Sequence, residues 1–227
     1  MRGARPAAGG GRWVEISPER LRGWLDGFYG RHDGASEDGL TLTGASNGDT
    51  ATLHPPPGVD GVTDVDGLLT ALIQPPRLGL LLARKGAVAA GVVDGTAVVV
   101  SKVERHYVQG RTAAGGQSQQ RYARRRDNQA TAAAGRAADI VARVLLPYRP
   151  ATPGSTDAGE STGVGEPIHA LVCGGDRLMV DAVLADRRLA PLLPLRHPHV
   201  LDCPEPRFAV LQDAAVAARR VRIHLVP

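Results

Sequence analysis

The stretch TAAGGQSQQRYARRR, residues 112–126, holds the residue types in this sequence that are best suited to chemistry. Gly115 and Gly116 can adopt positive φ and let the backbone approach a ligand closely. Gln117 offers an amide with two donor hydrogens and one acceptor oxygen, and it does not titrate near neutral pH. A glutamine is therefore a poor general base, but it can hold a water molecule or a carbonyl group in place. Such a group suits the cleavage of an ester by water.

Arginine surrounds these three residues. The segment 105–126 contains six arginines and no acidic residue. A guanidinium group pairs with phosphate through two parallel hydrogen bonds, so a cluster of this kind is suited to RNA. Three of the arginines recur at spacings of three and four residues, which places them on one face of a helix. The residues predicted to contact RNA phosphates are Arg111, Arg121, Arg124, Arg125 and Arg126. The alternative is a Gly-rich turn followed by a basic helix that only faces solvent.

Three aliphatic runs precede the glycines, and each is predicted to be a β-strand. They cover residues 78–83, 87–93 and 96–107. The polar stretches between them, Arg84-Lys85-Gly86 and Asp94-Gly95, are typical of hairpin turns. The third strand leads directly into the Gly-Gly-Gln loop. We therefore expect an antiparallel meander to hold one end of that loop.

A long helix is predicted directly after the loop, over residues 118–146, because apolar residues recur there at spacings of three and four. Pro147 ends it. Residues 149–166 are rich in Pro, Gly, Ser and Thr without periodicity, and we expect a flexible excursion there. Strand and helix then alternate, with strands predicted at 168–173, 199–203 and 221–226 and helices at 176–185 and 207–220.

The N-terminal part of the sequence predicts a smaller set of elements. Residues 1–12 are basic, rich in glycine and lack an apolar run, so we expect a disordered arm rather than a signal peptide. A strand is predicted at 13–16, a helix from Ser17-Pro18 to Gly30, a strand or hairpin at 40–53 and a helix at 63–73. Together the elements predict an α/β fold: one domain over residues 13–227, with one mixed sheet, helices on its faces and the Gly-Gly-Gln loop projecting before the long helix.

The amino-acid composition limits the kind of core, metal site and membrane segment that the chain can form. Hydrophobic residues make up 43% of the chain and aromatic residues only 4%, so the core must be mostly aliphatic. The net charge is +4 and comes almost entirely from arginine, since Lys85 and Lys102 are the only lysines. Cys173 and Cys203 have no metal-ligand spacing and are expected to be reduced thiols. No apolar run is long enough to span a membrane.

The segment GGQSQQRYARRR resembles the GGQSALRFARLR segment of the eukaryotic and archaeal class-one peptide-chain release factors. The sequence RLGLLLARKGAVAAGVVDG is similar to the meander that precedes this motif in their middle domain. The sequence ALVCGGDRLMVDAVLADRRL is similar to the strand, glycine turn and helix that follow the long helix there. The resemblance covers about residues 77–203. The Asn-Ile-Lys-Ser tetrapeptide of the codon-reading domain is missing, so stop-codon decoding is not expected.

The best match is the Vms-like branch of that superfamily, which acts in ribosome quality control and has small stand-alone members in actinobacteria. The resemblance implies an RNase H-like fold and a peptidyl-tRNA hydrolase that releases nascent chains from stalled large ribosomal subunits. In such an enzyme Gln117 positions water at the ester, while Gly115 and Gly116 shape the tip. It further implies that the partners are the ribosomal RNA of the large subunit and peptidyl-tRNA. A monomer is expected in the cytoplasm, with no cofactor, metal or membrane.

Two other functions stay open on the sequence alone. One is a non-catalytic RNA- or ribosome-binding module that uses the same basic helix, and the other is a nuclease of related fold. Further groupings of polar residues are weaker candidates for a site. The grouping His197, His199 and Cys203 lacks a fourth metal ligand, and the acidic residues Asp64, Asp66, Asp176 and Asp181 are expected to cap helices or face solvent. Gly174-Gly175 is expected to be a plain turn, and Trp13 and Trp24 are expected to lie in the core.

Overall fold

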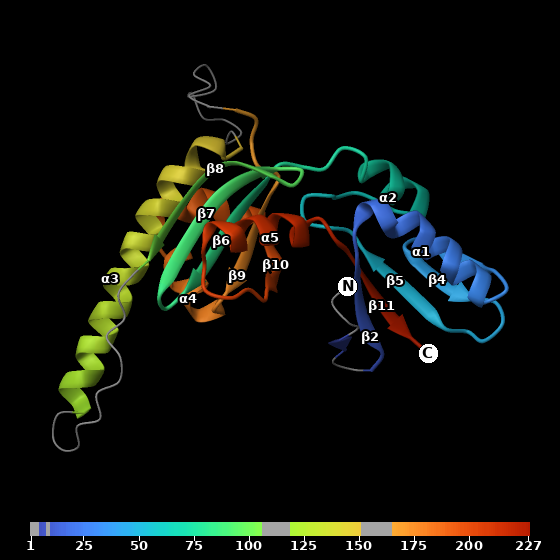
Figure 1. Cartoon of the computed structure of the whole chain (residues 1–227), viewed down its shortest axis with the longest axis horizontal. Coiled ribbons are helices and arrows are strands. Elements are labelled where there is room, and N and C mark those ends of the chain that lie inside the picture. Colours follow the sequence, from blue (N-terminus) through green and yellow to red (C-terminus); the bar gives the residue numbers. More distant parts are fainter. Residues whose placement is uncertain (1–4, 8–9, 106–118, 151–164) are drawn as a thin grey trace. The chain divides into compact units, whose positions relative to one another are not determined.

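The computed structural model describes residues 5–7, 10–105, 119–150 and 165–227, and for residues 119–130 it describes the backbone alone. The chain divides into two compact units. Unit 1 comprises the residues up to Pro76 together with Val216–Pro227, and unit 2 comprises Arg77–Ala215. Each unit has a sheet of its own (Figure 1). The α/β fold class is thus confirmed, but the expected single sheet differs from the structure, which has two sheets because the last strand pairs inside unit 1.

The sheet of unit 2 has five strands in the order β10-β9-β6-β7-β8. Neighbours β6, β7 and β8 are antiparallel, whereas β9 and β10 run parallel to β6. Three antiparallel strands with two parallel strands added beside the first is the arrangement of an RNase H-like sheet, as the resemblance implied. The strands are β6 (Leu78–Arg84), β7 (Ala87–Asp94), β8 (Ala97–Arg105), β9 (Ala170–Gly175) and β10 (Arg196–Leu201).

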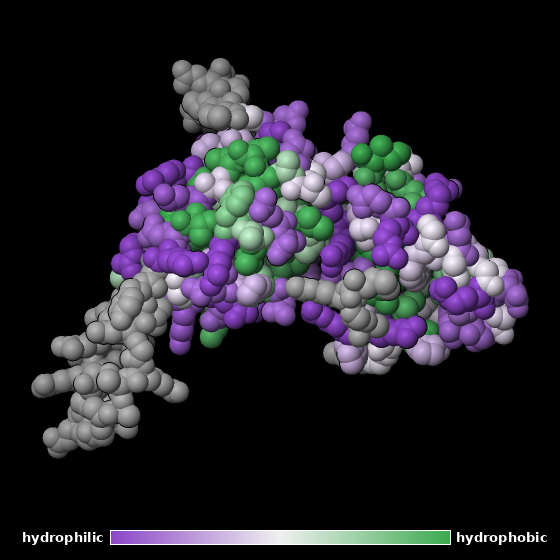
Figure 2. Space-filling model, in the orientation of Figure 1, coloured by the Kyte–Doolittle hydropathy of each residue, from purple (hydrophilic) through white to green (hydrophobic). Residues whose placement is uncertain are grey.

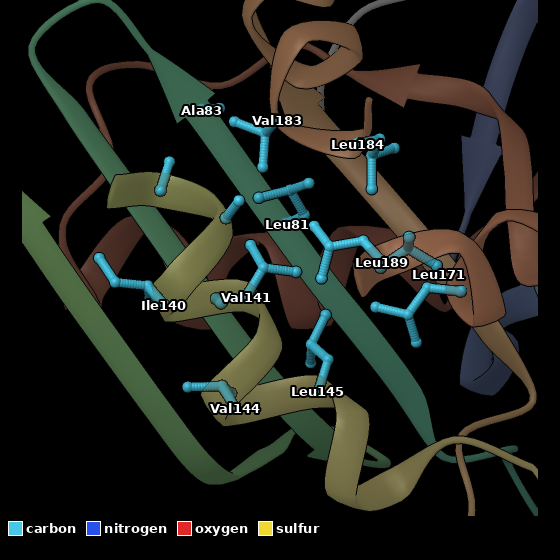
Figure 3. Close-up of a cluster of buried hydrophobic side chains, with 14 of the residues drawn as sticks. Leu81, Ala83, Ile140, Val141, Val144, Leu145, Leu171, Val183, Leu184 and Leu189 are labelled. Atoms are coloured by element: carbon cyan, nitrogen blue, oxygen red, sulfur yellow. The ribbon is translucent and has the colours of Figure 1, made fainter. Parts of the chain in front are cut away.

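Helices cover both faces of this sheet because the central strands are aliphatic on both sides. Leu81 and Ala83 of β6 face the helices α3 (Gln119–Leu145) and α4 (Arg177–Leu184), with which they form one buried cluster (Figure 3). Short 3-10 segments, η1 (Leu146–Tyr148) and η3 (Arg187–Leu195), continue this layer. On the opposite face α5 (Phe208–Ala218) packs so closely that a Cβ at Gly91 would lie 2.8 Å from Leu211 Cδ2.

Gly175, the last residue of β9, has φ of +96°. This conformation lets the next residue, Asp176, donate its backbone N–H to the carbonyl oxygen of Ala83 at 2.8 Å. The Asp176 side chain in turn accepts from Leu178 N at 3.0 Å and caps α4. Gly174-Gly175 is therefore a strand end followed by a turn, in keeping with the sequence.

Substitution of Gly175 by alanine is expected to destabilise unit 2. The new Cβ would lie 2.3 Å from the carbonyl oxygen of Ala83, a backbone atom that cannot rotate away. Strain at positive φ adds to this clash, and together they should lower the free energy of unfolding by about 2–4 kcal/mol. Urea unfolding followed by circular dichroism measures the loss. The control is Gly135→Ala on α3, where nothing lies within 4 Å of the new Cβ and stability should rise slightly.

Unit 1 is an antiparallel sheet with the order β1-β2-β11-β5-β4-β3 and two helices. Leu21, Leu25 and Phe28 of the first helix are buried against the apolar face of the sheet. That helix begins at Pro18, as expected. The elements are β1 (Arg5–Pro6), β2 (Arg12–Ile16), α1 (Pro18–Arg31), β3 (Ala35–Asp38), β4 (Thr41–Gly44), β5 (Thr50–His54), α2 (Val65–Ala71) and β11 (Val221–Val226).

The sequence missed a few elements. Arg5 and Pro6 pair with β2, within a segment expected to be a disordered arm. Neither β3 nor η3 was predicted, and β10 begins at Arg196 rather than at residue 199. The excursion expected at 149–166 lies mostly outside the described residues. Among the described residues, no helix is long and apolar enough to cross a lipid bilayer.

Candidate functional site

The residues predicted to do chemistry fall at the junction of β8 and α3. Gly115, Gly116, Gln117 and Arg111 lie outside the described residues, between the end of β8 at Arg105 and the start of α3. The other four arginines predicted to contact RNA belong to the first turns of α3, where the backbone is helical. They are Arg121, Arg124, Arg125 and Arg126. The long helix expected at 118–146 is confirmed.

Only one end of α3 is anchored in the described core. Among the α3 residues whose side chains are described, 131–145, the buried ones are Ala134, Ala137, Ala138, Ile140, Val141, Val144 and Leu145. They lie against β6, β7 and β9 and against α4 (Figure 3). A helix of 27 residues is about 40 Å long, whereas this anchored part spans about 18 Å. The first half of α3 accordingly extends past the strands in Figure 1.

Two features fix the anchored end of α3. Pro147 cannot continue an α-helix, and the chain turns there into η1. Tyr148 is buried beneath the helix, and its carbonyl oxygen accepts from Ile168 N at 2.8 Å, which ties the end of the helix to the approach to β9. The helix is thus held as a rigid rod at its C-terminal end, while its N-terminal end carries the residues next to Gln117.

The other end of the loop is held by β8. This strand is at the edge of the sheet and pairs with β7 from Ala97 to Arg105. The described residues therefore provide two fixed supports, a strand of nine residues and a helix of 27, for the segment that contains the Gly-Gly-Gln motif.

The weaker candidate sites take structural roles. Among the described residues, no three His, Cys, Asp or Glu side chains come together in a way that could hold a metal ion. Asp64 caps α2 by accepting from Gly67 N at 2.7 Å, and Asp181 pairs with Arg196 at 2.6 Å. Cys173 and Cys203 form no disulfide within the described residues and are both buried, and burial raises the pKa of the Cys173 thiol to about 11. None of these groups lies at the junction of β8 and α3.

Trp13 does not lie in the core, so the prediction for this residue was wrong. The core of unit 1 lies on the other face of its sheet, and the Trp13 ring instead stacks on His224 with a centroid distance of 4.8 Å. The Arg222 guanidinium carbon lies 4.2 Å from the centre of the same ring. Burial, with Arg222 and His224 nearby, lowers the pKa of His54 at the edge of this group. Trp24 does pack against the core, as expected.

Comparison with protein families first defines the class of protein. The family model that matches residues 76–224 describes release factors, and the match includes all of unit 2. The chain belongs to this family, the Actinobacteria/chloroflexi VLRF1 release factors. The match does not extend over β2, α1 or the β3–β5 strands of unit 1.

Two solved structures are similar in part. The crystal structure of an archaeal translation termination factor, aRF1, has a TM-score of 0.44 and 13% sequence identity, over 91% of this chain and 63% of that one. A structure described as an archaeal protein has a TM-score of 0.36 and 14% identity, over 67% of this chain and 37% of that one. The chain thus covers less than two thirds of the length of either. No curated protein matches the sequence.

Proposed function

We propose that the protein is a peptidyl-tRNA hydrolase that releases nascent chains from stalled large ribosomal subunits. Gln117 would hold the attacking water and the 3′-terminal ribose, while Gly115 and Gly116 would let the backbone approach the ester. The observation that carries the proposal is the position of the motif. It directly precedes a helix whose C-terminal half is anchored in the core, in the unit that the release-factor family covers.

The proposed reaction requires the protein to supply only one positioned amide group. The ester of peptidyl-tRNA is already reactive toward water, and a ribosomal site supplies the surroundings of the reaction. The protein must then deliver one amide to the ester and keep it oriented, which lowers the entropic part of the barrier. Neither a metal nor a cofactor is needed for this step. The protein would act in the cytoplasm, as a monomer that binds ribosomal RNA and peptidyl-tRNA.

A single assay separates this proposal from its alternatives. Purified protein is mixed with stalled large subunits that carry labelled peptidyl-tRNA, and the products are separated on a gel. Free peptide with intact tRNA supports the hydrolase. Binding to the subunit without any change in peptidyl-tRNA supports a non-catalytic ribosome-binding module. Cleaved tRNA supports a nuclease.

Gly116→Val is expected to abolish peptide release. Valine disfavours positive φ and adds an isopropyl group where the backbone must approach the ribose. We expect release to fall at least about a hundredfold, the scale on which the loss of one positioned group acts. Ala113→Val adds similar bulk to the same segment and serves as the control. If the Gly116 variant released peptide as fast as the Ala113 variant, Gly116 would be an ordinary loop residue.

A further inference from the structure

The solvent-facing side of α3 continues beyond the arginines that precede its anchored part. In the part of α3 with described side chains, the exposed residues are Thr131, Ala132, Gly135, Arg136, Asp139 and Arg143. At 3.6 residues per turn they fall on one face, opposite the buried residues. Figure 2 shows hydrophilic residues over these turns of the helix.

This face is cationic. Arg136 and Arg143 form no ion pair with any other described residue. Asp139 is the single acid on the face, and Arg188 of η3 binds it with 2.8 Å between Nη2 and Oδ1. Arg188 also donates to Asp186, which lowers the pKa of that carboxyl to about 2. Arg188 thus shares its one positive charge between Asp139 and Asp186, and Arg136 and Arg143 are the cations of this face that no described carboxylate binds.

The two described arginines are in phase with two of the predicted RNA-contacting ones. Positions 121, 125, 132, 136, 139 and 143 are separated by 4, 7, 4, 3 and 4 residues, a spacing that keeps them on one side of the helix. From position 121 to position 143 the helix rises about 33 Å. The same side of the helix therefore carries arginines near both of its ends, at positions 121 and 125 next to Gln117 and at positions 136 and 143 on the body of unit 2.

We propose that Arg136 and Arg143 belong to an extended RNA-binding face of α3, whose partner is the sugar–phosphate backbone of ribosomal RNA. This inference rests on the proposed function, since it deepens the account of how the protein lies on the large subunit. Arginine is suited to phosphate because its guanidinium fork matches two phosphate oxygens. The face therefore binds RNA through charge and not through base sequence.

The uncharged residues of this face favour RNA over a protein partner. Stable protein partners are usually held by large buried side chains at the centre of the interface. Among the described side chains of this face, the uncharged exposed ones are Thr131, Ala132 and Gly135, and none of them is large enough to serve as such an anchor. A small-residue surface with flanking arginines instead lets a polyanion lie close along the helix.

The test compares two double variants of the full chain. Arg136→Gln with Arg143→Gln removes two charges from this face. Arg177→Gln with Arg207→Gln removes two charges from exposed arginines on other elements, next to α4 and α5, and is the matched control. Dissociation constants for large subunits carrying peptidyl-tRNA are measured from about 0.05 to 0.3 M salt. Thermal unfolding confirms that both variants are folded.

We expect the α3 variant to bind about tenfold more weakly, or worse, at about 0.1 M salt. The slope of log K against log salt should become shallower by about 1.5, because two phosphate contacts are lost. The control should stay close to the wild type. An α3 variant with wild-type affinity and slope overturns the inference.

Binding to protein-free ribosomal RNA of the same subunit identifies the partner. The α3 variant should lose affinity for this RNA as well. If it loses affinity for intact subunits only, the partner is a ribosomal protein and the inference is wrong. The binding test does not depend on the proposed hydrolase activity. If the wild-type protein released no peptide, the hydrolase proposal would fail, but the binding measurements would still show whether Arg136 and Arg143 contact RNA.

Discussion

Replacing Gln117 with alanine is expected to abolish peptide release and to leave folding and ribosome binding nearly intact. The amide is proposed to act only at the ester, where the loss of one positioned polar group commonly lowers the rate by about 10²–10³. Single-turnover release from stalled large subunits measures this rate. The affinity of the variant for the same subunits is measured in a separate binding assay. An unchanged affinity would show that the variant is impaired in the chemical step.

Neighbouring glutamines provide a matched control for this variant. Gln119 and Gln120 carry the same side chain and begin α3. Their alanine variants remove an amide of identical size from adjacent positions and should release peptide at close to the wild-type rate. Near-normal release by the Gln117 variant would sink the proposed mechanism. Equal loss in all three variants would instead point to a requirement for the polar run as a whole.

Leu145→Ala is expected to have the largest effect on stability among simple core truncations of α3. Leu145 is fully buried at the anchored end of the helix. Loss of its three outer carbons leaves a cavity between α3 and the sheet, and such changes cost about 2–5 kcal/mol of unfolding free energy. Urea unfolding followed by circular dichroism measures the change. Peptide release per folded molecule should fall too, because the helix that carries the motif would lose part of its support.

The control for this core truncation is an exposed leucine of the same unit. Leu178 on α4 is 80% exposed, and Leu178→Ala should change the unfolding free energy by less than about 0.5 kcal/mol. A Leu145 variant that proved no less stable than the Leu178 variant would show that α3 is not held by this cluster. The extended rod inferred from its burial pattern would then lack its anchor.

Elements whose structure is decided by a local residue pattern could be predicted from the sequence. The continuous aliphatic runs of β6 and β7 predict buried strands, because helices cover both faces of the sheet. The long amphipathic pattern from Gln119 to Leu145, closed by Pro147, predicts α3 almost to the residue. The Gly-Gly-Gln motif and its basic neighbours predicted a release factor, and the family match confirms that class.

Other features, such as the extent of β10 and the position of Trp13, depend on contacts between distant segments and could not be predicted from a local pattern. Residues 196–198 were not predicted as strand because of Pro198, yet β10 includes them, since β10 is an edge strand and an edge tolerates a missing N–H donor. Trp13 was expected in the core because tryptophan is largely apolar. Its alternation along β2 places it on the uncovered side once β11 pairs with that strand. The exposed face of α3 at Arg136 and Arg143 became visible only when the buried residues were known.

The pairing of β11 constrains the order in which the protein can fold during its synthesis. β11 lies between β2 and β5 at the centre of the unit 1 sheet, yet it is made after every other strand and helix in the chain. Unit 2 has all of its residues once Ala215 has emerged, so it can fold while the sheet of unit 1 is still in two separate pieces. A nascent chain that stalls before Val221 would therefore hold every residue of unit 2, while the β1–β2 pair and strands β3–β5 of unit 1 would lack the strand that joins them.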